Sequence, residues 1–187
     1  MAYTDRLIEA YNKMISNDYV NALIQICIAL DAVAKKHYGD KPGKRIKRYL
    51  RVNQPIITRV AIDCEMYGDI TFVVEGKKDL TFEEIIYALI RCALLHEGEL
   101  DSRVKIVASA SIGLDAEGNF LLSEQMIRAL FLLLVSDPHT AQITWPPTAS
   151  FSFEGKTVSF ANIQGNQNLL LESIRSASKK TKPVSEV

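Results

Sequence analysis

Arg91 and His96 are the two residues of this chain whose types and spacing best suit catalysis. An arginine guanidinium keeps its charge at ordinary pH and can hold a phosphate through two parallel hydrogen bonds. A histidine imidazole titrates near neutral pH, so it can take a proton from a ribose 2′-hydroxyl or give one to a leaving oxygen. Together these groups suffice to cleave RNA without a metal ion. The pair therefore predicts phosphodiester chemistry.

Both residues lie on one predicted helix over about residues 82–97. Thr81 and Glu84 form the sequence pattern of a capping box at its start, and Gly98 is a stop signal just past its last turn. Isoleucine and leucine occur on every side of the helical wheel, which is typical of a helix buried by its neighbours. A guanidinium is costly in such a place without a negative or polar partner. We expect Arg91 either to be paired inside the fold or to face a pocket or a partner.

The spacing of the pair limits what one helix can do. Arg91 and His96 are five positions apart, which separates them by about 140° around an ideal α-helix. A single helix therefore does not present both groups to one small ligand. Two arrangements would bring them together: a helix that loosens before Gly98, or a second copy of the chain across a two-fold axis, which would place four groups around one cleft.

The segment Arg91-Cys-Ala-Leu-Leu-His96, late in an apolar helix that follows several others, resembles the R-x(4–6)-H motif of the HEPN superfamily. Members of that superfamily are helical-bundle proteins, and many are dimeric metal-independent ribonucleases in toxin–antitoxin, CRISPR and other defence systems. The resemblance covers roughly residues 1–100. It implies that Arg91 holds the scissile phosphate and His96 transfers protons. It also implies a homodimer, RNA as the substrate, an antitoxin or other protein as a partner, and no cofactor or metal.

The same two residues also have structural interpretations. A histidine near a helix C-terminus is often a capping group stabilised by the helix dipole. A buried arginine often pairs with an acid, and Asp31 on an otherwise apolar helix face is a candidate partner for Arg91. Cys92 stands where active HEPN members often carry a polar residue. Cys92 and the zero net charge favour the alternative function, a catalytically silent HEPN-like module that binds nucleotide, nucleic acid or protein, whereas the buried Arg91 favours the enzyme.

A basic run without any acidic residue covers residues 41–51. Four of its cations share one helix face at i, i+3, i+4 and i+7 spacing: Lys44, Lys47, Arg48 and Arg51. Like charges so placed repel one another, so their concentration indicates a polyanionic partner such as RNA. Tyr49 on the same segment can stack on a base. The alternative is a solvated helix face that opposes acidic surface elsewhere in the fold.

The bulk composition is that of a globular protein. The 187 residues are 48% hydrophobic and 24% charged, enough for one ordinary domain with a real core. Lys and Arg together number 22, as do Asp and Glu, so the overall charge says nothing about nucleic acid. No apolar run approaches the ~20 residues that cross a bilayer, and the first residues lack a signal-peptide pattern. These observations predict a cytoplasmic protein.

Cysteine and histidine spacing gives no metal or disulfide motif. Cys27, Cys64 and Cys92 are widely spaced and each falls in a helical pattern, so we expect buried free thiols. His37 and His139 have no acid or thiol at ligand or triad spacing, and we expect both on the surface or in loops. Patterns for zinc proteases, nucleotide-binding loops and dinucleotide folds are absent from the sequence.

The patterns predict a mainly α fold, with an antiparallel HEPN-like helical bundle and small peripheral antiparallel β hairpins. The bundle covers residues 1–100, an α+β continuation of the same domain covers 101–177, and a polar flexible tail covers 178–187. Further predicted helices cover 5–16, 18–37, 44–51, 55–66, 123–135 and 162–177, and a strand covers 70–74. One hairpin pairs 104–112 with 120–121 around a turn at 115–118, and a second pairs 150–153 with 157–160.

Overall fold

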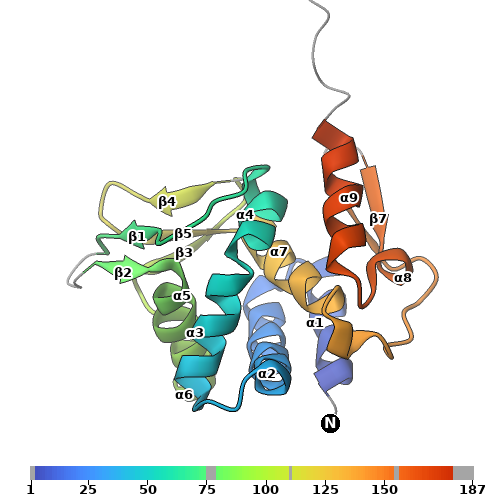
Figure 1. Cartoon of the computed structure of the whole chain (residues 1–187). Helices are drawn as coiled ribbons and strands as arrows, with labels where there is room; N and C mark the ends of the chain where they lie inside the picture. The colour runs from blue at the N-terminus through green and yellow to red at the C-terminus, as the bar shows by residue number, and fades with distance from the viewer. Residues whose placement is uncertain (1–2, 75–78, 110, 154–155, 179–187) are drawn as a thin grey trace, which may run out of the picture.

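The computed structural model describes residues 3–74, 79–109, 111–153 and 156–178, and over these ranges it is mainly helical, as predicted (Figure 1). The helices are α1 (Tyr3–Ile15), α2 (Tyr19–His37), α3 (Pro42–Val52), α4 (Gln54–Ile62), α5 (Phe82–Ile85), η1 (Ile86–Cys92), α6 (Ala93–His96), α7 (Glu124–Val135), η2 (Pro138–Thr140), α8 (Phe160–Ile163) and α9 (Gln167–Ser178). Of these, η1 is a π-helix and η2 a single 3₁₀ turn.

Small sheets lie at the edges of the helical core. The strands are β1 (Thr71–Phe72), β2 (Leu80–Thr81), β3 (Val104–Val107), β4 (Ile112–Leu114), β5 (Phe120–Ser123), β6 (Ser150–Phe153) and β7 (Lys156–Ser159). The β1–β2 and β6–β7 pairs are antiparallel. The β6–β7 pair is the second predicted hairpin, although residues 154–155 of its turn lie outside the described ranges, whereas β1 was predicted as a strand at 70–74 without a partner. In the third sheet β5 is central, antiparallel to β4 but parallel to β3. The prediction of antiparallel hairpins alone is therefore wrong for β3, because β4 runs back before the chain enters β5 in the direction of β3.

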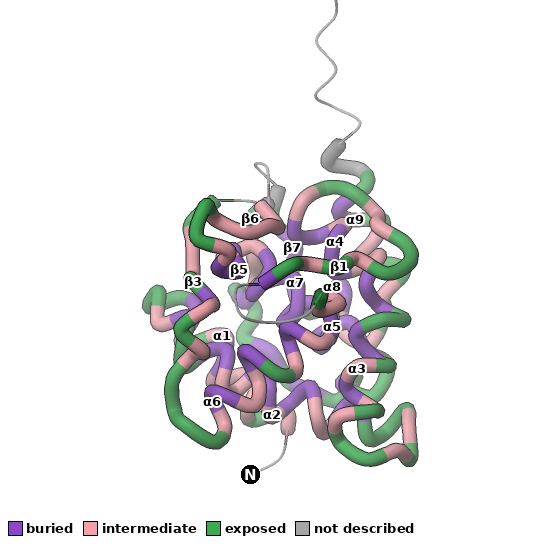
Figure 2. Tube along the Cα trace, turned by 90° about the vertical axis from the view of Figure 1, so that its left-hand side faces the viewer, coloured by how far each residue is buried: buried purple, intermediate pink, exposed green. Residues whose placement is uncertain are grey.

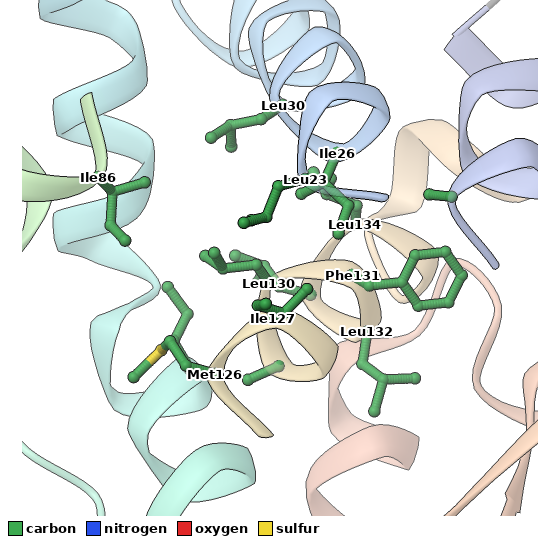
Figure 3. Packing of buried hydrophobic residues seen from close by; sticks show 14 of the residues in the cluster. Leu23, Ile26, Leu30, Ile86, Met126, Ile127, Leu130, Phe131, Leu132 and Leu134 are labelled. Carbon is green, nitrogen blue, oxygen red and sulfur yellow. The ribbon is translucent and has the colours of Figure 1, made fainter. Parts of the chain in front are cut away.

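The core is built around α7. Its apolar residues cover all sides of the helix, and nine of its twelve residues are buried. Helices α1, α2 and α4 pack against it, and Figure 2 shows the buried residues gathered in the interior. Figure 3 shows side chains of α2, α7 and η1 meeting in this cluster: Leu23, Ile26, Leu30, Ile86, Met126, Ile127, Leu130, Phe131, Leu132 and Leu134. Each such burial contributes about 1.5–3 kcal/mol of hydrophobic stabilisation.

The helix that carries Arg91 is one continuous run through α5, η1 and α6. The predicted capping box is present, with the Thr81 N–H donating to Glu84 Oε2 at 3.1 Å. Gly98 follows with φ +82°, the left-handed conformation that favours glycine after a helix. The prediction of burial on every side is wrong for one side, where Tyr87 is half-buried and Ala88 is exposed. Helix α3 packs beside this open side.

Two predicted helices are shorter than expected because of left-handed residues. Helix α4 ends at Ile62 instead of residue 66, since Asp63 adopts φ 54°. The predicted helix 162–177 is split into α8 and α9 at Gly165, which has φ +67° and donates its N–H to the Val135 carbonyl at 3.0 Å. A Cβ at Gly165 would lie 2.7 Å from Ala141 Cβ. Glycine therefore allows this close approach, which seats α8 and α9 against the end of α7. Of the predicted tail, residues 179–187 lie outside the described ranges.

The three cysteines are free thiols, as expected, but they are not equally buried. Cys27 is buried in α2, and this burial raises the pKa of its thiol to about 12. Cys92 is half-buried, and Cys64 is exposed because α4 ends before it. Full burial was therefore a wrong prediction for Cys64. Among the helices within the described ranges, none has the length and apolarity that a membrane crossing requires.

Candidate functional site

Arg91 points inward from η1 toward α2. Its side chain is only 14% exposed, and its Nη2 lies 3.8 Å from Asp31 Oδ2. The guanidinium also lies 5.7 Å from the centre of the Tyr87 ring, and Nη1 is 4.0 Å from Cys92 Sγ. The predicted pairing of Arg91 with Asp31 is therefore confirmed.

One carboxylate serves two arginines at this place. Arg45 of α3 donates to Asp31 Oδ1 from Nε at 3.0 Å and from Nη2 at 2.6 Å, which leaves Oδ2 for Arg91. The longer contact belongs to Arg91, and its buried Nε has no hydrogen-bond partner among the described residues. Two guanidiniums share a single negative charge, so the space between α2, α3 and η1 keeps an excess of positive charge.

His96 is the last residue of α6, and its side chain is exposed. Within the described part of the chain it makes no hydrogen bond or ion pair, and none joins it to Arg91. The helix does loosen before Gly98, into the π-helix η1, yet Arg91 is largely buried while His96 is exposed. A composite site would need a second copy of the chain, and homodimerisation stays a prediction.

The predicted basic face lines a cleft of about 830 Å³ between α3 and the start of the α5–η1 helix. Its lining comprises Lys41, Gly43, Lys44, Lys47, Arg48, Arg51, Thr81, Glu83, Glu84 and Tyr87. The four cations predicted from their spacing thus meet in one cleft. The prediction for Tyr49 is wrong, because it occupies the inner face of α3, is 1% exposed and donates its hydroxyl to Asp137.

Acidic side chains oppose this basic face, as the structural alternative expected. Lys47 pairs with Glu84 at 3.5 Å and Arg51 with Glu83 at 3.6 Å across the cleft. Asp40 lies 3.1 Å from Lys44 and 3.9 Å from Arg48. Partly exposed pairs of this kind contribute about 0–1 kcal/mol each, so a phosphate can replace a carboxylate at small cost. Five cations and two carboxylates line the cleft, and Asp40 and Asp69 also pair with its cations, so the cations exceed these acids by one.

Tyr87 supplies an aromatic surface in the cleft that sequence reasoning missed. Its ring lies against Gly43, where an added Cβ would stand 2.9 Å from Tyr87 Cζ and Oη. Burial, and then neighbouring Cys92, raise the pKa of the Tyr87 phenol, so it stays neutral near pH 7. The ring also connects the cleft to Arg91, which lies one helical turn further along. The sequence signal was the i, i+4 spacing of Tyr87 and Arg91.

His37 and His139 are exposed, as expected, but the prediction that no acid accompanies them is wrong. The end of α2 and the turn η2 bring them together on either side of Asp137, with His37 Nε2 2.8 Å from Asp137 Oδ2. Asp137 and His139 are two positions apart, but His37 is a hundred positions from Asp137, so local spacing could not place it in the cluster.

The fold and these sites define a mainly helical protein with a positively charged cleft. A family model described as Rv1289 matches residues 3–185, and the chain belongs to the Rv1289 family. The searches of curated proteins and of solved structures gave no match.

Replacing Asp31 tests the shared carboxylate. We expect Asp31→Asn to lower the free energy of unfolding by about 2 kcal/mol, because two largely buried guanidiniums lose their counter-charge. Asp69→Asn, in an exposed pair with Arg51, should cost less than about 1 kcal/mol. Urea denaturation followed by circular dichroism measures both. Equal losses in the free energy of unfolding would show that the Asp31 contacts stabilise the fold no more than the exposed pair does.

Proposed function

We propose that this protein binds single-stranded RNA in the cleft between α3 and the α5–η1 helix. One observation carries the proposal: five cationic side chains and one aromatic ring line the same cleft. Phosphate contacts supply most of the affinity for nucleic acids, and aromatic rings stack on bases without regard to sequence. A cleft with both features fits a short RNA segment better than an apolar ligand.

The spacing of the cations along α3 matches a nucleic-acid backbone. From Lys44 to Arg51 the helix rises about 10 Å, at ~1.5 Å per residue. Stacked nucleotides in one strand rise about 3.4 Å each, so the basic face spans about three nucleotides. Tyr87 lies near the start of this face, against Gly43. The arrangement lets phosphates contact α3 while one base stacks on the phenol ring.

Glu84, one of the two acids in the cleft, has another partner when a phosphate arrives. Glu84 accepts the backbone N–H of Thr81, and this hydrogen bond, followed by the charge of Lys47, lowers the pKa of Glu84. Lys47 can therefore leave for a phosphate while Glu84 keeps its capping bond. Lys41 is exposed and has no ion pair among the described residues, so it is free to contact a phosphate at once.

The second candidate function is metal-independent RNA cleavage. It goes with a second proposal, that this protein is related to the HEPN superfamily. The observation that favours it is Arg91 Nε, a buried donor without a hydrogen-bond partner in the described residues. Catalysis would require Arg91 to exchange Asp31 for the scissile phosphate and a homodimer to bring His96 of another copy nearby. RNA binding in the cleft needs neither change. If the protein cleaves RNA, we also expect an antitoxin or other protein as its partner.

The cleft cations can be tested by RNA affinity. We expect the double variant Lys44→Ala, Arg48→Ala to bind a fluorescein-labelled ten-nucleotide single-stranded RNA at least about tenfold more weakly, measured by fluorescence anisotropy. Losing two phosphate contacts should also reduce the slope of log affinity against log salt by about 1.4. Lys105→Ala, a basic residue of β3 outside the cleft lining, is the control. An unchanged affinity in the double variant would contradict the proposal.

The aromatic contact has its own signature. We expect Tyr87→Leu to weaken RNA binding by about 1–3 kcal/mol without changing the salt slope, because stacking involves no phosphate charge. Tyr87→Phe keeps the ring and should bind like the unaltered protein. Anisotropy titrations at three salt concentrations separate this effect from that of the cations. A steeper loss for Tyr87→Phe than for Tyr87→Leu would show that the hydroxyl matters rather than the ring.

Binding and cleavage are distinguished in one incubation. We expect end-labelled RNA to stay intact with the protein and EDTA, because Arg91 is paired with Asp31 and lies apart from His96. Denaturing gel electrophoresis measures the result. Fragments ending in 2′,3′-cyclic phosphate that disappear in His96→Ala would instead establish the nuclease candidate.

A further inference from the structure

A cluster of two histidines and one aspartate lies where the ends of α2 and α7 meet. One possible ligand atom of each residue, from His37, Asp137 and His139, lies within 4.8 Å of the others. His37 ends α2, Asp137 follows α7, and His139 belongs to η2. The cluster shares no residue with the lining of the RNA cleft, so it is independent of the function proposed above.

Asp137 is held rigidly at the bottom of the cluster. Its side chain is 0% exposed. Oδ2 accepts hydrogen bonds from the Tyr49 hydroxyl and from His37 Nε2, each at 2.8 Å, and Oδ1 accepts the His139 backbone N–H at 2.9 Å.

The two imidazoles form the open side of the cluster. Both histidines are exposed, and their ring centres are 4.7 Å apart in an edge-to-face arrangement. The Tyr3 hydroxyl donates to the His139 carbonyl, which fixes η2 against the start of α1. The buried carboxylate therefore lies next to two exposed rings that are already adjacent.

We propose that His37, Asp137 and His139 bind a divalent transition-metal ion, Zn²⁺ being the best fit. Zinc takes imidazole nitrogen and carboxylate oxygen as ligands at about 2.0–2.2 Å, and three protein ligands leave a fourth position for water or another ligand. Mg²⁺ and Ca²⁺ prefer all-oxygen sites and fit this donor set poorly. On binding, the ion replaces the hydrogen bond between His37 Nε2 and Asp137, and the neutral His37 ring carries its proton on Nδ1.

Groups around the cluster provide the outer hydrogen bonds that metal ligands need. The Tyr49 hydroxyl and the His139 backbone N–H remain on the Asp137 carboxylate when His37 turns to the ion. Such bonds hold a ligating carboxylate in place and raise metal affinity. The bound ion links the end of α2 to the end of α7, so it should also raise the midpoint temperature of unfolding.

The histidine content of the chain offers a matched control. The sequence has three histidines, of which two are in the cluster and the third is exposed His96. Chelator-treated, tag-free protein carrying Cys64→Ser, which removes the exposed thiol as a competing ligand, is titrated with ZnCl₂ by calorimetry. We expect one ion per chain in this protein and in its His96→Ala variant. His37→Ala and His139→Ala should each weaken binding at least about tenfold, and MgCl₂ should give no binding.

The opposite results would overturn the metal site. Zinc binding that survives in the His37→Ala, His139→Ala double variant, or that disappears in His96→Ala, places the ion elsewhere. Absence of binding identifies the cluster as a hydrogen-bonded structural junction. A second measurement uses no ligand variant: zinc should shift the imidazole ¹⁵N signals of His37 and His139 but not those of His96. Unshifted signals for His37 and His139 at saturating zinc would contradict the proposal.

Discussion

Burial of α7 is the constraint on which the rest of the structure depends. A twelve-residue helix with nine buried residues cannot be covered by one neighbour, so α1, α2 and α4 must surround it. This fixes the direction of α2, whose less apolar side then faces α3 and η1 and presents Asp31 to them. The same packing brings the end of α7 beside the end of α2. The positions of Asp31 and of the cluster at the ends of α2 and α7 therefore both follow from how α7 is covered.

Two aspartates then join helices through polar contacts outside the apolar core. Asp31 joins α2 to α3 through Arg45 and to η1 through Arg91, while Asp137 joins the end of α7 to α2 and α3. A partly buried guanidinium or carboxylate is tolerated only when such partners are present. The two groups differ in how fully their polar atoms are hydrogen-bonded. Both carboxylate oxygens of Asp137 accept hydrogen bonds, whereas Arg91 Nε has no partner among the described residues. Arg91 Nε shares this unsatisfied state with Arg128 Nε among the described residues.

Local sequence patterns predicted much of the fold and part of the candidate site. Helix starts and stops, the capping box at Thr81 and the shared face of the basic residues depend on neighbours within a few positions, so spacing predicted them. The pairing of Arg91 with Asp31 could also be predicted from the sequence, because an acid on an apolar helix face needs a cation. The parallel pairing of β3 depends on tertiary packing and was missed. The inward direction of Tyr49 was also missed, although Tyr49 shares the apolar face of Ile46 and Leu50 at i, i+3 and i+4 spacing. The His37 cluster was missed because His37 is a hundred positions from Asp137 and only the packing of α2 against η2 joins them.

The connection between α2 and α3 brings the two proposed sites close to each other. The Arg48 guanidinium, which lines the cleft, lies 4.6 Å from the centre of the Tyr38 ring, and that ring lies 5.9 Å from the His37 ring. Asp40 in the same connection pairs with Arg48. A phosphate that draws Arg48 away from Asp40 would also remove the cation from Tyr38, beside one proposed metal ligand. Tyr38 therefore offers one route for coupling between RNA and metal binding, and Tyr49 offers another, because it lies on α3 and donates to Asp137.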